Sequence, residues 1–387
     1  MSKNSGTVLL RVDFNSPTKN GEITDFTRIQ NHTETIETVS KSYQKVVLMT
    51  HQGRKGRDDF VSTSKHADKL SKLIDNSVEH LESINPDSLK KDIEDSESTV
   101  ILIENTRFFS DETKDYETSE EASRCTFVEK LSETSDLYIN DAFSVGHRKH
   151  ASVIGFPELL ESYYGPLFQS EVLSLDNSAD ESTVYCIGGS KVTDKAKYSE
   201  KLLRNNRAGK ILTTGLLANL ILYSTREIEP SVETPEVFDR IDTEYFENNL
   251  GDRVHIPSDY ATESDGKRHE INKDSTGGDE LLDIGSRTIK SYKDILKNSS
   301  SVVMIGPSGL YEDERFRDGT CELLRVVSEH KNGKIAGGDT ISASNTCTVS
   351  DFEFVSTGGG AALVFLATGT LPAMESIGEV SEKNSIL

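Results

Sequence analysis

Short runs of apolar residues recur along the whole chain, and polar stretches with helical spacing lie between them. The runs are continuous and rich in Val, Ile and Leu, which is typical of parallel strands buried on both faces. We expect strands at residues 8–12, 46–49, 100–103, 137–139, 184–187, 211–212, 302–305, 335–336 and 352–355. We expect helices at 29–43, 64–74, 122–131, 197–203, 288–296 and 319–330. Strands that alternate with helices indicate α/β sheets built from right-handed crossovers.

The length of 387 residues suggests two domains, because about 150 residues is typical for one. The stretch 158–175 follows Phe156-Pro157 and predicts a long helix, and the polar segment 176–182 comes before the next strand. A helix between two α/β units would serve as a connector and a hinge. The acidic stretch 225–283 is weakly periodic and predicts only a strand near 253–256.

Acidic residues outnumber basic ones by 65 to 43, so the formal net charge is −22. Such a surface repels the phosphates of nucleic acids and anionic lipids, and we expect neither as a partner. Without a long apolar run or the apolar region of a signal peptide, the sequence predicts a soluble, cytoplasmic protein. The acid excess favours adaptation to high salt over disorder, because the apolar runs continue throughout. Lys is not depleted, however, which weakens the salt interpretation.

The four cysteines lie far apart in the chain. They are Cys125, Cys186, Cys321 and Cys347, and no two have CxxC spacing. The sequence therefore indicates neither a zinc site nor a disulfide framework.

Arg, His and amide side chains follow the predicted strands of the first half. Ligands bind beyond the carboxyl ends of strands in open α/β sheets, so these residues are the first candidates for a site. They are Asp13-Phe14-Asn15, His51-Gln52-Gly53-Arg54, Glu104-Asn105-Thr106-Arg107, and Asn140-Asp141 with His147-Arg148. Arg binds phosphate and carboxylate oxygens bidentately, so the set predicts an electropositive cleft for an anionic metabolite. The alternative, an ion pair with a nearby acid, suits a single Arg better than the whole set.

Glycines follow the predicted strands of the second half. The strand ends are Gly188-Gly189-Ser190-Lys191, Thr214-Gly215-Leu216, Gly306-Pro307-Ser308-Gly309, Gly337-Gly338-Asp339-Thr340 and Ser356-Thr357-Gly358-Gly359-Gly360. Glycine lets backbone N–H groups face phosphate oxygens, and the helices that follow add N-terminal donors. Lys191 and Lys195 could reach a transferring phosphoryl group, and Asp339 could hold Mg²⁺. A single Gly pair more often marks a turn, but five such ends favour nucleotide binding without a P-loop or a Rossmann fingerprint.

Nine ordered motifs together resemble those of phosphoglycerate kinases over essentially the whole chain. They are RVDFNSP at 11–17, LMTHQGR at 48–54, ENTRF at 104–108, NDAF at 140–143, HRKHAS at 147–152, GGSKVTDK at 188–195, GPSGLYE at 306–312, GGDT at 337–340 and STGGGA at 356–361. The compact length resembles the archaeal branch of the family, and the acidic composition suits a haloarchaeal member.

The resemblance implies two Rossmann-like α/β domains with parallel sheets joined by a hinge helix. The domains would be a phosphoglycerate-binding domain at 1–160, the interdomain helix at 161–178, a nucleotide-binding domain at 179–366, and a C-terminal segment at 367–387 that packs back towards the first domain. The implied reaction is 1,3-bisphosphoglycerate + ADP ⇌ 3-phosphoglycerate + ATP, with Mg²⁺ as cofactor. The reaction would serve glycolysis and gluconeogenesis. The enzyme would be a monomer that bends at the hinge.

The resemblance also implies the site residues of the first domain. The substrate-binding residues would be Asp13, Phe14, Asn15, Arg28, His51, Gln52, Gly53, Arg54, Arg107, His147 and Arg148. Four of them would hold the spectator 3-phosphate, namely His51, Arg54, Arg107 and Arg148. Asp13 and Asn15 would fix the glycerate, and Arg28 would contact its carboxyl group and the transferring phosphoryl group.

In the second domain the resemblance implies nucleotide-binding residues, with Arg28, Lys191 and Gly359 as the catalytic residues of the whole chain. The nucleotide set is Gly189, Lys191, Lys195, Gly215, Gly285, Gly306, Glu312, Gly337, Gly338, Asp339 and Thr340. Within it Glu312 would bind the ribose, Gly285 would line the adenine pocket and Asp339 would hold the metal. Ile305 and Thr214 depart from the common Asn and Gly of the family, which bears on nucleotide affinity more than on the chemistry.

Two alternatives stay open beside an active kinase. One is a catalytically silent paralogue that binds nucleotide or phosphoglycerate. The presence of all four charged candidates argues against it, namely Arg28, Lys191, Lys195 and Asp339. The other is a kinase for a different carboxylic acid, which the intact set of Arg residues disfavours.

Overall fold

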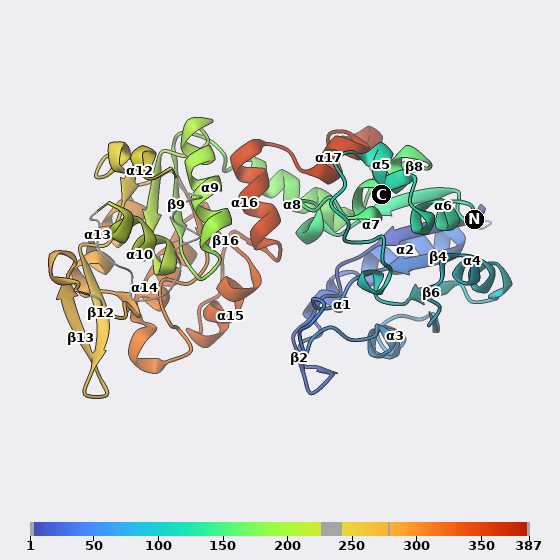
Figure 1. The fold of residues 1–387 in the computed structure, drawn as a ribbon, viewed down its shortest axis with the longest axis horizontal. Coiled ribbons are helices and arrows are strands. Elements are labelled where there is room, and N and C mark those ends of the chain that lie inside the picture. Colours follow the sequence, from blue (N-terminus) through green and yellow to red (C-terminus); the bar gives the residue numbers. More distant parts are fainter. Residues whose placement is uncertain (1–3, 226–241, 278, 385–387) are drawn as a thin grey trace. The chain divides into compact units, whose positions relative to one another are not determined.

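The computed structural model describes residues 4–225, 242–277 and 279–384, which form two compact units (Figure 1). The first unit comprises Met1–Val172 and Thr370–Leu387, and the second comprises Leu173–Gly369. The division falls inside helix α8 (Pro166–Asp176). Within the described ranges, no helix has both the length and the apolar character needed to cross a membrane.

A six-stranded parallel sheet forms the centre of the first unit, in the order β5-β6-β4-β1-β7-β8. Its strands are β1 (Asn4–Arg11), β4 (Tyr43–Met49), β5 (Val78–Leu81), β6 (Val100–Ile103), β7 (Leu137–Asn140) and β8 (Glu161–Tyr164). The successive residues Val8, Leu9 and Leu10 are all fully buried, so both faces of the sheet are covered. This burial explains why the strands are apolar without alternation.

Short helices and one small hairpin complete the first unit. The helices are α1 (Thr27–Asn31), α2 (Thr33–Ser42), α3 (Ser64–Leu70), α4 (Pro86–Asp95), α5 (Ser119–Ser123), α6 (Thr126–Ser132), α7 (Ala151–Ile154) and α17 (Pro372–Ile377), with the 3₁₀ turns η1 (Thr106–Phe108), η2 (Phe143–Val145), η3 (Phe156–Glu158) and η6 (Glu382–Asn384). The hairpin joins β2 (Thr18–Lys19) to β3 (Glu22–Ile23). The returning C-terminal segment is tied to this unit, because Ala373 N donates to Gly146 O at 3.0 Å and the Tyr164 hydroxyl donates to Gly378 O at 2.6 Å.

The second unit contains another six-stranded parallel sheet, in the order β11-β10-β9-β15-β16-β17. Its strands are β9 (Thr183–Ile187), β10 (Lys210–Thr213), β11 (Val254–His255), β15 (Ser301–Ile305), β16 (Gly333–Ala336) and β17 (Phe354–Ser356). The strand order is that of a doubly wound sheet. From β9 the chain adds strands first on one side, as β10 and β11, and then on the other side, as β15, β16 and β17, so the order reverses between β9 and β15. The predicted α/β class with two parallel-sheet domains is confirmed.

The helices of the second unit cover both faces of its sheet, and a small antiparallel sheet adjoins it. The helices are α9 (Val192–Arg204), α10 (Gly215–Ser224), α12 (Thr243–Asn249), α13 (Ser286–Lys297), α14 (Asp318–Glu329), α15 (Gly338–Thr346) and α16 (Gly359–Thr368), with the 3₁₀ turns η4 (Lys273–Ser275) and η5 (Glu314–Phe316). The small sheet has the order β13-β12-β14 and consists of β12 (Asp259–Ser264), β13 (Lys267–Asn272) and β14 (Asp283–Ile284). Apolar residues of α13, α14 and α15 share one hydrophobic cluster with β9, β15 and β16, so these helices cover the same face.

Three expectations about local structure were wrong. The predicted helix over 158–175 is a 3₁₀ turn, the edge strand β8 and then α8, because Tyr163 and Tyr164 favour a strand and Pro166 begins a helix. The predicted helix over 29–43 is interrupted at His32, which separates α1 from α2. The stretch 225–283 contains the β12–β13 hairpin, whose exposed strand lacks an apolar run, while its residues 226–241 lie outside the described residues.

The cysteine spacing indicated no disulfide framework, but the structure contains one disulfide. Cys321 of α14 is bonded to Cys347, the residue after α15, with the two Cα atoms 5.3 Å apart. Because β15, β16 and β17 are adjacent in the sheet, the crossovers α14 and α15 lie side by side on one face. Sequence separation alone could not reveal this neighbourhood. Cys125 and Cys186 are free.

Candidate functional site

The strand order of the first unit brings the predicted binding residues to one edge of the sheet. Arg11, the last residue of β1, lies opposite Met49 of β4 and Asn140 of β7. The segments that begin at Asp13, His51 and Asp141 therefore leave the sheet next to one another. Parallel pairing converts three distant sequence motifs into one local site.

Asp13 is the centre of a polar network at this edge. Its buried carboxylate accepts hydrogen bonds from the Asn15 N–H at 3.1 Å and from the Ser144 hydroxyl, and it forms an ion pair with Arg28. Burial alone would raise the pKa of Asp13, but the charge of Arg28 and the hydrogen bonds hold it well below its usual value. Asp13 is thus a carboxylate that fixes the position of the Arg28 guanidinium.

His32 links this carboxylate to the neighbouring strand end. The Asp13 N–H donates to His32 Nε2 at 3.0 Å, and His32 Nδ1 lies 3.0 Å from the Asp141 carboxylate. The imidazole therefore accepts at Nε2 and donates from Nδ1, which is the arrangement of the neutral ring. This role also explains why the helix is interrupted at His32. His32 could not be recognised as a site residue from the sequence, because its spacing fits a continuous helix.

A cluster of guanidinium groups lies beside this network. The pKa of Arg107 is lowered to about 10, first by burial and then by the charges of Arg11, Arg54 and Arg148, against the opposing effect of Glu112. Arg107 donates to Gly53 O, while its buried Nε has no hydrogen-bond partner among the described residues. Guanidinium groups that lower one another's pKa indicate a site that an anion would stabilise.

Ion pairs within the chain do not account for most of this cluster. In the described part of the chain, the guanidinium groups of Arg54, Arg107 and Arg148 have no carboxylate oxygen within 4.0 Å, whereas that of Arg28 is paired with Asp13. The alternative that each Arg simply pairs with a nearby acid thus holds for Arg28 alone.

Arg11, which was not predicted as a site residue, is a buried neighbour of the cluster. It is fully buried and donates from Nε to Ser152 Oγ at 3.0 Å and from Nη1 to Met49 O at 3.3 Å. Its position at the end of an apolar run was the available signal. His150 is another missed residue, and burial lowers its pKa to about 4 despite the nearby Glu112.

The remaining predicted residues of the first unit shape the site to different degrees. Gln52 is buried and engaged with the backbone of Ser16, accepting from its N–H at 3.0 Å and donating to its carbonyl at 2.9 Å. Phe14 is fully buried, and the Asn15 side chain accepts from the Gly53 N–H at 2.9 Å. His147 is half-buried beyond η2. These contacts hold the strand-end loops against one another.

In the second unit, the glycine loops after β9 and β15 meet where the strand order reverses. Gly306 has φ +92°, and a Cβ at this position would lie 2.2 Å from Gly188 O and 2.7 Å from Lys195 Nζ. Gly189 has φ +79°, and its Cβ would lie 2.8 Å from the same Nζ. Only glycine allows the two loops to approach each other and Lys195 this closely.

Lys195 lies between these loops and donates to Gly188 O. Burial lowers the pKa of Lys195 to about 8, an effect that Asp339 opposes and Lys191 reinforces. Lys191, Lys195 and Asp339 are therefore electrostatic neighbours, although they follow β9 and β16.

The loops after β15, β16 and β17 are also joined. The Thr340 hydroxyl accepts from the Gly306 N–H at 2.8 Å and donates to Ala336 O at 2.7 Å. A Cβ on Gly359, at the start of α16, would lie 2.7 Å from Gly337 Cα. The structure thus brings the predicted residues Gly306, Gly337, Thr340 and Gly359 together.

The other four predicted residues of this unit differ in their surroundings. Gly215 begins α10 and donates from its N–H to Ser308 O at 2.9 Å, which joins it to the β15 loop. Gly338 and Glu312 are exposed. Gly285 precedes α13, and its Cβ would lie 2.3 Å from the carboxylate carbon of Asp259, so its environment is a packed helix start.

Asp339 is the predicted metal ligand, and its carboxylate is exposed in the first turn of α15. Within the described ranges, no group of three or more His, Cys, Asp or Glu side chains is arranged to hold a metal ion. One carboxylate beside a phosphate-binding surface fits Mg²⁺, which binds through one or two carboxylates together with substrate phosphates and water.

Comparisons with known proteins agree on one family. The family model described as "Phosphoglycerate kinase" matches residues 2–369. A phosphoglycerate kinase of Archaeoglobus fulgidus is 38% identical, over 96% of this chain and 93% of the relative. That of Halobacterium salinarum is 35% identical, over 95% of this chain and 96% of the relative. The crystal structure of phosphoglycerate kinase from Pyrococcus horikoshii superposes with a TM-score of 0.84 at 32% identity and covers 96% of both chains.

Proposed function

Because the chain belongs to the phosphoglycerate kinase family and functions as a phosphoglycerate kinase, a phosphotransferase of glycolysis, we propose how its residues divide the reaction. The first unit binds 3-phosphoglycerate or 1,3-bisphosphoglycerate, and the second binds ADP or ATP. The Arg cluster of the first unit is the single observation that supports this division most strongly.

The spectator 3-phosphate binds to Arg54, Arg107 and Arg148, together with His51. The three guanidinium groups have no carboxylate partner in the described part of the chain, and their mutual repulsion is relieved when a dianionic phosphate enters. Asp13 and Asn15 orient the glycerate, and Arg28 faces its carboxyl group. The lowered pKa of Asp13 keeps Arg28 paired and oriented at neutral pH.

The nucleotide phosphates bind to the second unit at the glycine loops around Lys195. Backbone N–H groups at the starts of α9, α15 and α16 supply further donors. Asp339 would hold Mg²⁺, which neutralises phosphate charge when it is bound with the nucleotide. Glu312 binds the ribose and Gly285 borders the adenine pocket.

The transfer itself needs no protein nucleophile and no general base. The carboxylate of 3-phosphoglycerate is already ionised, so its oxygen attacks the terminal phosphoryl group of ATP directly, and the reverse step returns that group to ADP. Arg28 and Lys191 stabilise the negative charge of the phosphoryl group in transfer, and the N–H groups at Gly359 do the same. Water must be excluded during this step, and we propose that α8 bends as a hinge to allow it.

The wider setting of the protein is part of the same proposal. We place it in the cytoplasm of a salt-adapted archaeon, as a monomer that works in gluconeogenesis as well as in glycolysis. The net charge of −22 supports a halophilic, haloarchaeal type.

Calorimetric titration of each substrate tests the division between the units. Arg107→Ala should weaken binding of 3-phosphoglycerate by about 10²-fold, since it removes charge-assisted hydrogen bonds to phosphate, and should leave MgADP binding unchanged. The control is Arg124→Ala, which removes an exposed Arg of the first unit that pairs with Glu120. Equal 3-phosphoglycerate affinity in Arg107→Ala and the wild type would refute the proposed phosphate site.

A further inference from the structure

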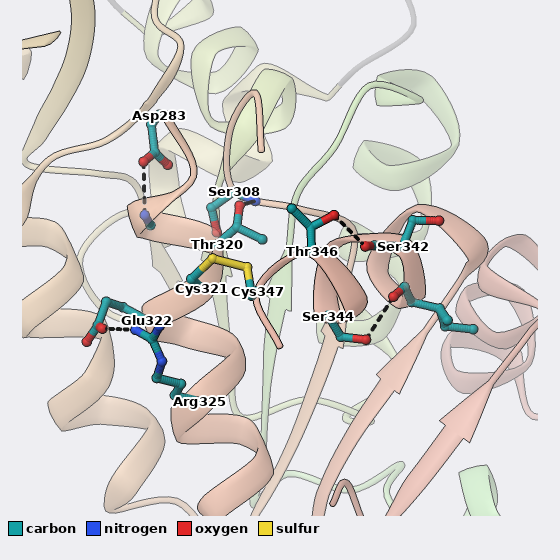
Figure 2. Close-up of a disulfide and its surroundings, with 12 residues drawn as sticks. Asp283, Ser308, Thr320, Cys321, Glu322, Arg325, Ser342, Ser344, Thr346 and Cys347 are labelled. Carbon is teal, nitrogen blue, oxygen red and sulfur yellow. Dashed lines mark hydrogen bonds and ion pairs between the residues drawn. A yellow bond between two sulfur atoms is a disulfide. The ribbon is translucent and has the colours of Figure 1, made fainter. Parts of the chain in front are cut away.

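The disulfide joins two helices next to the proposed nucleotide site. Cys321 lies in the first turns of α14, and Cys347 follows the last turn of α15 (Figure 2). Both cysteines are buried, with relative exposures of 6% and 9%. The bond therefore fixes the spacing of α14 and α15 inside the core of the second unit.

The same two helices hold the loop after β15 from both ends. The Thr320 hydroxyl, next to Cys321 in α14, accepts from the Ser308 N–H at 2.9 Å (Figure 2). The Thr340 hydroxyl, in the first turn of α15, accepts from the Gly306 N–H at 2.8 Å. The loop 306–308 is thus hydrogen-bonded at one end to α15 and at the other end to α14.

This loop in turn sets the position of groups assigned to the nucleotide. Gly306 lies against Lys195 Nζ, and Ser308 O accepts from the Gly215 N–H at the start of α10. The first turn of α15 also carries Asp339. Since α15 has only nine residues, a shift of its last turn relative to α14 also moves its first turn.

We propose that the Cys321–Cys347 disulfide is a redox-sensitive positioning element for nucleotide binding: reduction loosens α15 from α14, displaces the loop 306–308 and weakens binding of the magnesium–nucleotide. The inference rests on the proposed nucleotide function of the second unit. The step balances with a dithiol as reductant. One thiolate attacks a sulfur of the disulfide, the S–S bond breaks, and the second thiol displaces the mixed disulfide. The dithiol is oxidised to a disulfide, and Cys321 and Cys347 gain its two electrons and two protons and become thiols.

Titration calorimetry on the full chain tests the proposal, with MgADP and 3-phosphoglycerate as separate probes. The samples are the oxidised wild type, the wild type reduced with dithiothreitol, and Cys321→Ala/Cys347→Ala. Thiol counting after denaturation defines each state of the wild type, with two thiols expected before reduction and four after it. Cys186→Ala is the matched control, because it alters a buried free cysteine of β9 in the same unit. Melting temperatures are recorded for all samples.

Reduction should raise the Kd for MgADP by about fivefold or more and leave the Kd for 3-phosphoglycerate unchanged. The double variant should show the raised Kd with and without dithiothreitol, and Cys186→Ala should respond to reduction like the wild type. A melting temperature that falls on reduction while the Kd for MgADP stays constant would show a merely structural bond and overturn the proposal. Four thiols before reduction would overturn it as well. Failure of the oxidised wild type to bind MgADP at all would instead refute the nucleotide function on which the proposal rests, and the proposal with it.

Discussion

Arg11 donates a hydrogen bond to Nδ1 of His51 across 3.3 Å, within the buried edge of the first sheet. A guanidinium can only donate, so the His51 ring accepts at Nδ1 and carries its proton on Nε2. Burial, together with the charges of Arg107 and Arg11, lowers the pKa of His51 well below its usual value. His51 is therefore a neutral imidazole near pH 7, with its Nε2–H available as a donor.

This relationship predicts the behaviour of His51 substitutions. His51→Ala removes the Nε2–H donor and should weaken 3-phosphoglycerate binding about tenfold, the usual effect of losing one hydrogen bond to a charged group. His51→Gln retains an N–H donor and should lose less. Calorimetric titration at pH 7 measures both, and affinity in His51→Ala equal to that of the wild type would contradict the assigned role.

Arg28→Ala should lower kcat by about 10² to 10³, because Arg28 is assigned to the charge of the transferring phosphoryl group. The far-ultraviolet circular dichroism should stay unchanged. Steady-state kinetics at saturating substrates measures the effect, with Arg124→Ala as the control for loss of an exposed Arg. A kcat within twofold of the wild type would remove Arg28 from the chemistry.

The pKa of Lys195, lowered by burial to about 8, predicts how nucleotide affinity depends on pH. Below pH 7 the ammonium group is charged, and as the pH rises through 8 the charge is lost and phosphate binding weakens. The KM for the nucleotide should therefore rise between pH 7.5 and 9. Lys195→Arg stays charged over this range and should remove the rise, whereas Lys191→Arg should retain it. An identical pH profile in Lys195→Arg and the wild type would show that deprotonation of Lys195 does not cause the rise in KM.

Buried histidines predict loss of stability in mild acid. Burial lowers the pKa of His66 to about 4, far below the roughly 6.5 of an unfolded chain. Between pH 6.5 and 4, His66 is therefore protonated in the unfolded state but not in the native state. Its contribution to the free energy of unfolding is fully present above pH 6.5 and is lost as the pH drops towards 4. At pH 5 the loss from this one fully buried residue is about 2 kcal/mol.

Urea unfolding at pH 7, 6 and 5 measures this dependence. His66→Gln should reduce the acid loss even if the variant is less stable at every pH. His269→Gln, in the exposed strand β13, serves as the control and should leave the slope unchanged. A pH slope in His66→Gln as steep as that of the wild type would show that His66 does not carry the effect.

Much of the candidate site follows from the sequence because parallel sheets collect their strand ends at one edge. Asp13, His51 and Arg107 lie within four residues of the end of an apolar run, so their convergence required no knowledge of strand order. The glycines after β9 and β15 converge for the same reason. Burial on both faces made these strands easy to recognise, since each is a continuous apolar run.

The features that the sequence could not predict depend mostly on contacts between elements that are far apart in the chain. His32 lies within a helical pattern, and only its hydrogen bonds to Asp13 and Asp141 explain the interruption. The bond between Cys321 and Cys347 requires the order β15-β16-β17, which no spacing encodes. The β12–β13 hairpin was missed because its outer strand is almost wholly exposed and so lacks an apolar run.

The proposed phosphoryl transfer requires both the Arg cluster of the first unit and the glycine loops of the second. A coupled assay of ATP consumption, run with purified protein across a series of KCl concentrations up to the multimolar range, tests it most directly. We expect consumption that depends strictly on 3-phosphoglycerate, is not supported by other carboxylic acids, and rises with KCl. No 3-phosphoglycerate-dependent consumption at any KCl concentration, with the protein folded by circular dichroism, would contradict it.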